Sequence, residues 1–542
     1  MPKNSLLLYA FFITMVVTVC TSCAKRGSIT GGAKDTIPPS IVRSSPRNMS
    51  TEFRGNEIRI DFDEYVKIKN ANKQLIISPP METAPIITPT GSASKYIRIK
   101  IRDTLQPNTT YSFNFGQSIT DNNEGNPYSQ FRFVFSTGTY IDSLRLDGRI
   151  KDAQSQKADD FVTVMLYEDN ETYNDSTVFN ERPRYVTNTL DSMVVFSLQN
   201  LKKGKYHLFA LKDENNNYRY DPKSDKIGFL PYTITVPNDT IYELELFKEQ
   251  LPFEAKRPKQ ASSNRLYAGF AGTPKAEDIK ITVADAATNE PIKTITTVLK
   301  DKDSVQVWLP RNITTDSLKV NMAYRDSIND FTMRFKEMKA ADSLSVNALQ
   351  TGTLHFREKF TLKTTTPLTA IDSTKISLIQ KDSANVPFTY AYDDFKQELK
   401  FDFEKEEEQQ YTFTLLPGAL RDFYDTENDT LTYRLKTTLL SDYGNLRVKL
   451  TNADRFPLLL QITNAKEEVQ AAYYSEGETE INFDGILPTQ YLLRVIYDDN
   501  KNGKWDTGNY LQKIQPEQII YFTKPIDVRA NWDVNQVFNL AE

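Results

Sequence analysis

Short stretches in which apolar and polar residues alternate recur along most of the chain. The first of them lie at residues 58–62, 96–101, 111–115 and 131–135. Successive side chains of a β-strand point to opposite faces of the sheet, so a period of two predicts strands with one buried face. Proline, asparagine and glycine between the stretches mark turns. The pattern therefore predicts an all-β protein built of tandem β-sandwich domains.

The alternation also divides the chain into blocks, because 542 residues are too many for one hydrophobic core. A linker is expected where proline and serine collect, at residues 250–264. The predicted blocks are 41–140, 141–249, 265–348, 349–440 and 441–542.

The N-terminal 22 residues contain an apolar stretch from Leu6 to Cys20, behind the basic Lys3. This stretch is shorter than the about 20 apolar residues of a membrane span, and Cys23 follows it closely. The arrangement resembles a bacterial lipoprotein signal peptide, with an uncleaved anchor and an ordinary secretory signal as alternatives. The resemblance implies that Cys23 is lipidated and begins the mature chain, which two or more acyl chains would hold on a bilayer.

Residues 23–40 are predicted to form a tether. Gly31 and Gly32 make it flexible, and Pro38 and Pro39 stiffen its entry into the first block. The residues directly after Cys23 are basic, which leaves open whether the protein faces the cell surface or the periplasm.

Scarce cysteine and histidine argue against several kinds of active site. The chain has two cysteines, Cys20 and Cys23, so the mature chain would keep one thiol and lipidation would use it. The two histidines, His207 and His355, lie far apart, and His207 is interpreted as a strand residue. No disulfide, thiol nucleophile, serine hydrolase triad or zinc site is expected.

The charge distribution and the motifs of the chain argue against several further functions. Lys+Arg 66 and Asp+Glu 71 are interspersed, with a net charge of -5 and no basic stripe, so nucleic acid is not an expected partner. No phosphate-binding glycine loop or dinucleotide motif occurs. A hydrolase that uses a carboxylate pair is the lowest-ranked alternative.

The first block carries separated motifs in a fixed order. They are Pro38-Pro39, Ser45-Pro46, residues 60–64, Leu105 to Tyr111 and residues 121–126. This series resembles the bacterial Ig-like domain of surface-layer and outer-membrane proteins. The resemblance implies a sandwich of about seven strands and no particular activity.

The second block has a motif order of its own, at residues 148–150, 162–167, 196–201 and 204–208. This order resembles transthyretin-like and carboxypeptidase-regulatory-like modules, which are usually scaffolds.

Two internal repeats relate the blocks. Residues 411–415 with Asp422 repeat residues 111–115 with Asp121, which predicts a second Ig-like sandwich at residues 353–438. The segment from Leu201 to Asp221 is repeated from Leu487 to Asp506. The last block is therefore predicted to be a relative of the second.

The second repeat contains a loop with oxygen-bearing side chains at alternating positions. They are Asp213, Asn215, Asn217 and Asp221 in the first copy, and Asp498, Asn500, Asn502 and Asp506 in the second. The spacing matches the first, third, fifth and ninth positions of a calcium loop. Against this, Ser224 and Asn509 stand where the closing glutamate would be, and Tyr218 replaces the turn glycine that the second copy has at Gly503. A structural turn capped by its own side chains and a weak Ca²⁺ site are both kept as interpretations.

Aromatic residues crowd the same loops. They are Tyr218, Tyr220 and Phe229 in the first copy, and Trp505 and Tyr510 in the second, with Trp532 near the C-terminus. A sugar or a protein partner could stack on them, but their placement beside strands favours packing in the core. Tyr218, Tyr220, Trp505 and Tyr510 are kept as candidate binding residues.

A third motif is Asp followed by Ser or Thr and an apolar residue. It begins at Asp35, Asp103, Asp142, Asp239, Asp303, Asp316, Asp326 and Asp429. It resembles the O-glycosylation acceptor of exported Bacteroidota proteins, with a turn that enters a strand as the alternative.

These resemblances together predict a Bacteroidota outer-membrane lipoprotein without catalysis of its own. The predicted role is a cell-envelope scaffold or accessory subunit that contacts an outer-membrane protein or an assembly or secretion machine. A glycan-binding outer-membrane lipoprotein is the alternative.

Overall fold

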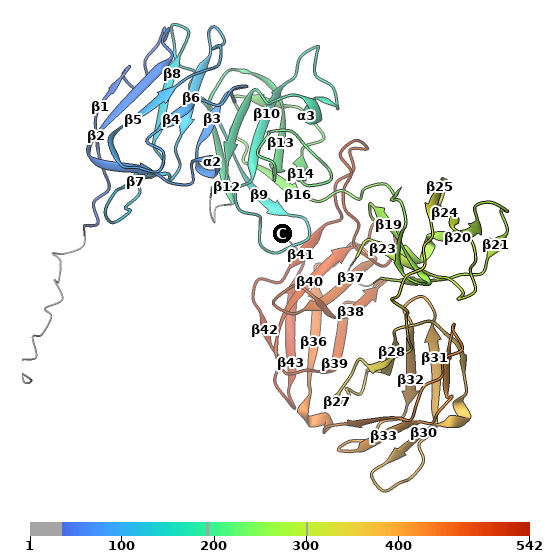
Figure 1. Cartoon of the computed structure of the whole chain (residues 1–542). Coiled ribbons are helices and arrows are strands. Elements are labelled where there is room, and N and C mark those ends of the chain that lie inside the picture. The colour runs from blue at the N-terminus through green and yellow to red at the C-terminus, as the bar shows by residue number, and fades with distance from the viewer. Residues whose placement is uncertain (1–34, 191–193, 300–301, 542) are drawn as a thin grey trace, which may run out of the picture. The chain divides into compact units, whose positions relative to one another are not determined.

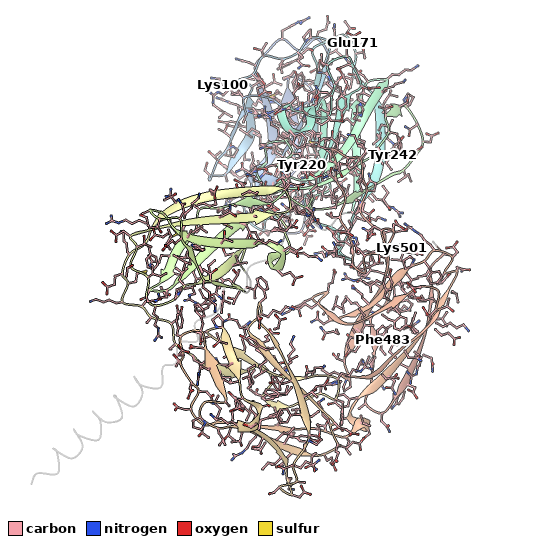
Figure 2. The ribbon with its side chains drawn as sticks, turned by 90° about the vertical axis from the view of Figure 1, so that its right-hand side faces the viewer. Lys100, Glu171, Tyr220, Tyr242, Phe483 and Lys501 are labelled. Atoms are coloured by element: carbon pink, nitrogen blue, oxygen red, sulfur yellow. The ribbon has the colours of Figure 1, made fainter. Side chains whose placement is uncertain are left out.

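The computed structural model describes residues 35–190, 194–299 and 302–541. The signal-peptide segment and Cys23 lie outside these residues. Regular structure is almost entirely β-strand, which confirms the predicted all-β fold (Figure 1), and Figure 2 shows the side chains on this framework. Within the described ranges, no helix is long and apolar enough to cross a membrane. The chain forms two compact units, which meet in sequence at Ser143 and Leu144.

The first unit, here called module 1 (residues 35–143), packs two sheets around an aromatic core. One sheet has the order β1-β2-β5-β4 with β7 paired to β2, and the other has the order β3-β6-β8. Ile60 of β2 and Phe113 of β6 are fully buried between them. The elements are β1 (Ile41–Ser45), β2 (Glu57–Ile68), α2 (Ala71–Gln74), β3 (Ile76–Ser78), β4 (Ile86–Thr88), β5 (Ser94–Lys100), β6 (Thr110–Asn114), β7 (Ile119–Asp121) and β8 (Arg132–Ser136).

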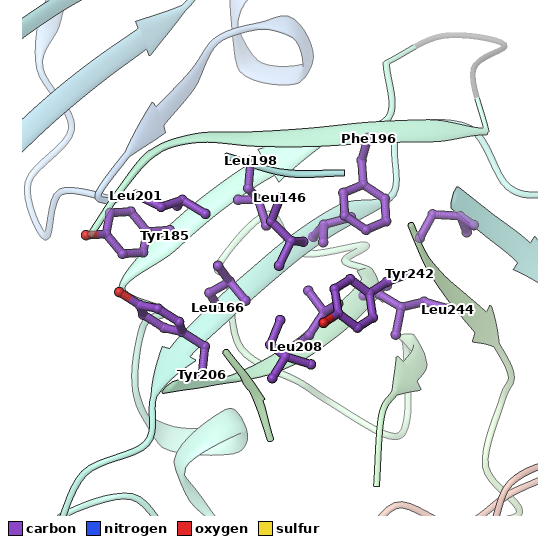
Figure 3. Close-up of a cluster of buried hydrophobic side chains, with 14 of the residues drawn as sticks. Leu146, Leu166, Tyr185, Phe196, Leu198, Leu201, Tyr206, Leu208, Tyr242 and Leu244 are labelled. Atoms are coloured by element: carbon purple, nitrogen blue, oxygen red, sulfur yellow. The ribbon is translucent and has the colours of Figure 1, made fainter. Parts of the chain in front are cut away.

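Module 2 (residues 144–249) begins the second unit. Its sheets have the orders β11-β10-β13-β14, with β15 paired to β13, and β12-β9-β16. Leucines from both sheets, such as Leu146 and Leu208, meet in the core that Figure 3 shows. The elements are β9 (Leu144–Asp152), β10 (Thr163–Glu168), α3 (Thr177–Asn180), β11 (Tyr185–Asn188), β12 (Val195–Leu201), β13 (Gly204–Lys212), β14 (Lys226–Phe229), β15 (Ile234–Val236) and β16 (Tyr242–Leu246).

Module 3 (residues 250–343) contains the segment that was expected to be a linker. Two short strands of that segment, β17 and β18, pair with β19. They are too short to show a clear alternation, and their proline-rich surroundings favour a linker by composition alone. The sheets have the orders β17-β19-β23-β22, with β18 paired to β19, and β21-β20-β24-β25. The elements are β17 (Glu254–Ala255), β18 (Lys259–Ser262), β19 (Arg265–Ala271), η1 (Ala276–Asp278), β20 (Lys280–Asp285), β21 (Pro291–Ile292), β22 (Ile295–Val298), β23 (Ser304–Trp308), β24 (Ser317–Tyr324) and β25 (Ser327–Arg334).

Module 4 (residues 344–438) has sheets of order β26-β28-β32-β31 and β27-β35-β33-β30, and β29 pairs with β34. Phe360, Phe401 and Phe413 are fully buried at its centre. The elements are β26 (Val346–Ala348), β27 (Gly352–Thr353), β28 (Phe360–Thr364), β29 (Leu368–Ile371), η2 (Ser373–Lys375), β30 (Ile376–Gln380), β31 (Phe388–Asp393), β32 (Glu398–Phe403), β33 (Gln410–Leu415), β34 (Leu420–Asp422) and β35 (Leu431–Lys436).

Module 5 (residues 439–541) has sheets of order β39-β36-β43 and β38-β37-β40-β41, with β42 paired to β40. Its β36 lies between an antiparallel and a parallel neighbour, as β9 does in module 2. The elements are η3 (Leu440–Asp442), β36 (Gly444–Thr451), β37 (Leu458–Thr463), β38 (Val469–Ser475), β39 (Glu480–Ile486), β40 (Gln490–Tyr497), β41 (Ile519–Tyr521), β42 (Ile526–Asp527) and β43 (Asp533–Asn539).

Both repeats extend to individual hydrogen bonds. The Tyr111 hydroxyl accepts from the backbone N–H of Gln106 at 2.9 Å, and the Tyr411 hydroxyl accepts from the N–H of Glu406 at 2.7 Å. Each donor lies five residues upstream of its tyrosine. The Tyr206 and Tyr491 hydroxyls each donate to a carbonyl four residues upstream. Module 4 thus shares the first of these tyrosine hydrogen bonds with module 1, and module 5 shares the second with module 2.

Candidate functional site

The two copies of the duplicated loop follow corresponding strands, β13 in module 2 and β40 in module 5. The first aspartate of each copy is buried, Asp213 at 8% exposure and Asp498 at 0%. The Asp213 carboxylate accepts from the N–H of Tyr218 at 2.8 Å, and the Asp498 carboxylate accepts from the N–H of Gly503 at 2.7 Å. Each aspartate therefore caps the turn that it begins.

Tyr218 adopts the backbone conformation of the glycine that it replaces. Its φ is 59°, and that of Gly503 is 76°. A side chain in this left-handed region costs about 1–2 kcal/mol, because its Cβ crowds the following carbonyl. The bond to buried Asp213 offsets that cost, so the absence of glycine does not change the turn.

A carboxylate closes each loop, at positions that the calcium-loop spacing did not indicate. In the first copy it is Asp225, fully buried, which accepts from the N–H of Asp221 at 2.9 Å. In the second it is Glu517, which accepts from the N–H groups of Asp499 and Asp506, both at 2.9 Å. Asp225 stands one residue beyond the expected position, and Glu517 is displaced by a longer insertion. An acidic residue just before β14 or β41 is the signal that could have identified them.

The amide side chains of the loops donate hydrogen bonds within each loop. Asn500 and Asn502 both donate to the carboxylate of Asp506, the first at 2.6 Å. Burial alone would raise the pKa of Asp506, but these bonds and Lys504 outweigh it and hold the pKa below its usual value. Among the described residues, no three His, Cys, Asp or Glu side chains form a group that could hold a metal ion. The contacts are those of a capped turn, and Ca²⁺ binding stays a prediction.

The longer second loop reaches module 2, where Tyr510 is fully buried. Its ring lies 5.3 Å from that of Phe229, 5.5 Å from that of Phe209 and 5.9 Å from that of Phe179, measured between ring centres. The backbone N–H of Tyr510 donates to a carboxylate oxygen of Glu249 at 2.6 Å. Module 5 thus inserts an aromatic side chain into a socket of module 2.

Glu249 joins both copies of the loop. Its second oxygen accepts from the hydroxyl of Tyr220 at 2.6 Å, and the side chain is only 9% exposed. Burial, together with the neighbouring carboxylate, raises the pKa of Tyr220 far above its usual value, so Tyr220 stays a donor. Two of the candidate aromatic residues, Tyr220 and Tyr510, therefore meet on one buried carboxylate.

Polar contacts surround the aromatic socket. Lys513 pairs with Asp175 at 2.6 Å, and its ammonium group lies 4.0 Å above the ring of Tyr510. The hydroxyl of Thr507 donates to the carbonyl of Lys248 at 2.7 Å. Gly508 lies so close to module 2 that a Cβ there would stand 2.7 Å from the ring of Phe247. A glycine is required at this close approach.

Modules 2 and 5 touch at a second place, on the carbonyl of Gln154. The hydroxyl of Tyr521 and the guanidinium of Arg494 both donate to it, the latter at 3.3 Å. Burial raises the pKa of Tyr521 to about 12, so this hydroxyl keeps its proton at neutral pH. Two separate contacts therefore fix one module against the other.

The remaining sequence candidates lie within single modules. Trp505 donates its indole N–H to the carbonyl of Glu517 at 2.8 Å, and both Trp505 and Tyr218 are half-buried in their own loops. Their role in binding a partner stays a prediction. His207 lies in β13, as expected, with its ring stacked on Tyr173 at 3.6 Å between centres.

Residues 35–137 match the family described as bacterial Ig-like domain. This match covers module 1, whose motifs carried the same resemblance. None of the curated proteins matches the chain.

Solved structures resemble the chain only distantly. Domains 1–6 of the surface layer protein SbsC are 11% identical, with 91% of this chain and 67% of that one covered and a TM-score of 0.16. The Bacteroides ovatus protein SGBP-B, solved with a mixed-linkage heptasaccharide, is 10% identical, with 71% and 91% covered and a TM-score of 0.18. The Bacillus anthracis TIE protein is 10% identical, with 94% and 76% covered and a TM-score of 0.14. Likenesses this distant assign no function to the chain.

Proposed function

We propose that the protein is a lipid-anchored, non-catalytic scaffold or accessory subunit of the bacterial cell envelope. Its partner would be an outer-membrane protein or an assembly or secretion machine. The observation that carries the proposal is the insertion of Tyr510 of module 5 into module 2, at the carboxylate of Glu249. A scaffold must hold its modules in a set arrangement, and this contact joins the last module of the unit to its first.

The other modules of the second unit also contact their neighbours. Tyr424 of module 4 donates to the carbonyl of Asn264 of module 3 at 3.2 Å and packs against Trp308. His355 of module 4 bonds the carbonyl of Gly485 of module 5 at 2.8 Å. Contacts thus link module 3 to module 4, module 4 to module 5, and module 5 to module 2, which favours a rigid framework over a flexible string of domains.

The N-terminal segment supplies the anchor in this proposal, with the lipid on Cys23. The end of the tether is held by module 1, since Asn126 donates to the carbonyl of Asp35 at 3.0 Å and the N–H of Ser40 donates to Asp63 at 2.8 Å.

The anchor is tested by growing cells with an alkyne analogue of palmitate. Wild-type protein should carry the label and sediment with membranes, whereas Cys23→Ala should carry none. Ser22→Thr is a matched control that leaves the cysteine in place. Membrane attachment without label would contradict the lipid anchor.

The scaffold role is tested by crosslinking intact cells and capturing the membrane-extracted protein. An envelope protein should be recovered in stoichiometric amount, and protease treatment of whole cells should show which face carries the modules. Recovery of the chain alone, in wild-type cells, would contradict the proposal.

A further inference from the structure

A cleft of about 490 Å³ lies where module 4 meets module 5. His355 and Arg357 of module 4 form one side of its lining, and Tyr443, Trp532 and Asp533 of module 5 contribute to the other. The volume falls within the roughly 300–1,000 Å³ typical of ligand pockets. No sequence motif indicated this place, because its residues come from four separate segments.

Trp532 is a large aromatic residue of the cleft lining that is 59% exposed to solvent. Its backbone is held by a bond from the N–H of Asn445 to the Trp532 carbonyl at 2.9 Å. Arg529 stacks on the indole at 5.5 Å from the ring centre. The turn before Trp532 can lie against the start of β36 because residue 444 is a glycine. A Cβ on Gly444 would collide with the carbonyl of Arg529. A large apolar ring is therefore presented to solvent on a fixed support.

The opposite side of the cleft is also ordered. The Nδ1 atom of His355 lies 3.0 Å from the backbone N–H of Arg357, which can only donate, so Nδ1 accepts. The hydrogen of the neutral ring is then on Nε2, which donates to the carbonyl of Gly485 at 2.8 Å. The ring edge packs on Tyr443 at 4.5 Å between centres. His355 thus ties the two sides of the cleft together.

The polar groups of the cleft include both donors and acceptors. Asp484 pairs with Arg447, and Asp533 accepts from the side chain of Asn445 at 2.8 Å. The exposed guanidinium of Arg357 has no hydrogen-bond or ion-pair partner in the described part of the chain. An anionic ligand would meet the two aspartates, and a purely apolar one would give the guanidinium of Arg357 no acceptor. The lining fits a neutral ligand rich in hydroxyl groups.

We propose that this cleft binds a neutral saccharide, with a sugar ring lying on the indole of Trp532. The C–H groups on one face of a pyranose are apolar and weakly positive, and they complement the negative face of an aromatic ring. The sugar hydroxyls can accept from Arg357 and donate to Asp484 and Asp533. This site is separate from the scaffold contacts at Tyr510 and does not depend on the scaffold role.

Tryptophan fluorescence provides a direct test on the purified full chain. The chain has three tryptophans, and Trp532 is the one among them that lines the cleft. Trp308 is fully buried and Trp505 is half-buried in its own loop. A ligand in the cleft should therefore change mainly the emission of Trp532. The probes are cellohexaose, mannohexaose, xylohexaose and chitohexaose, each titrated to millimolar concentration, followed by an array of neutral glycans. At least one saccharide should shift the emission of the wild type and leave Trp532→Phe unshifted.

Affinity measurements on variants complete the test. Trp532→Ala should weaken binding at least about tenfold, as loss of an aromatic stacking platform does, and Arg357→Ala should weaken it severalfold. Tyr232→Ala is the matched control, since Tyr232 is 58% exposed and lies in module 2. The affinity of the Tyr232→Ala variant for the saccharide should equal that of the wild type. Absence of binding to every neutral saccharide, or equal binding by Trp532→Ala, would overturn the proposal.

Discussion

Glu249 of module 2 accepts a hydrogen bond of 2.6 Å from the backbone N–H of Tyr510 of module 5. Because the same carboxylate also accepts from Tyr220, it satisfies two donors that are shielded from water. Removing the carboxylate leaves both donors unpaired, and an unpaired buried donor costs about 1–3 kcal/mol. This one side chain therefore couples the fold of module 2 to the docking of module 5.

Glu249→Ala should lower the free energy of unfolding of the second unit by about 2–4 kcal/mol. Chemical denaturation followed by tryptophan emission measures it, because all three tryptophans lie in this unit. Glu171→Ala is the control, at an exposed position of the same module that Figure 2 labels. It should change the free energy by less than about 0.5 kcal/mol. Equal effects of the two substitutions would contradict the role of Glu249.

Tyr510→Ala should open the contact between modules 2 and 5. Loss of a fully buried aromatic side chain costs about 3–5 kcal/mol, and the loop at residues 506–517 should then be cut faster by proteases. Leu511→Ala provides a neighbouring control, because Leu511 is 60% exposed. Limited proteolysis with mass spectrometry measures both variants. An uncut loop in Tyr510→Ala would show that the other contacts hold the modules together.

Calcium binding to the duplicated loops predicts a higher melting temperature with Ca²⁺ than with a chelator, since a ligand that binds only the folded state stabilises it. The double variant Asp213→Ala with Asp498→Ala should lose this dependence. Calorimetry of both proteins with and without Ca²⁺ measures the difference. Identical melting curves of the wild type in Ca²⁺ and in chelator would contradict calcium binding and show that the loops are capped turns only.

Asp121 should make module 1 sensitive to acid. Burial raises the pKa of its carboxyl, but bonds from the N–H groups of residues 123–126 outweigh that effect and hold the pKa below its usual value. The ionised form thus stabilises the folded state above the ordinary aspartate pKa of about 3.9, and this stabilisation is lost as the pH falls through the lower folded value.

Hydrogen exchange of residues 119–128 measures this sensitivity. In the wild type, protection should fall as the pH decreases below about 4. Asp121→Asn should be less protected at neutral pH and should change little between neutral and acidic pH. Glu124→Gln lies on the same turn at an exposed position and should behave as the wild type. A wild-type response in Asp121→Asn would assign the acid effect to another group.

Local pattern was sufficient to predict the all-β fold class. The alternation in residues 411–415 reports burial of one face, whereas Ser112 in the matching stretch is buried as well. Both stretches form strands with the same tyrosine bond. The turn aspartates were also predictable, because Asp213 and Asp498 bond amides a few residues away. Contacts of this kind depend on neighbouring residues only.

Asp225 and Glu517 were missed because the lengths of the loops differ between the copies, so no fixed spacing leads to the closing carboxylate. The strands at residues 254–262 were missed for a related reason. They are stabilised by pairing with β19 and not by a pattern of their own. In both cases a partner distant along the chain decides the outcome.

Side-chain alternation and short-range hydrogen bonds are local properties. The amino-acid sequence alone was therefore enough to predict the strands of this chain and the aspartates that cap its turns. The burial of Tyr510 against Glu249 and the exposure of Trp532 in a cleft follow from how the modules pack. Both are aromatic residues in loops beside strands, and nothing in their own segments distinguishes them. The difference arises because module 2 covers one of them, and burial depends on which surfaces the folded chain brings together.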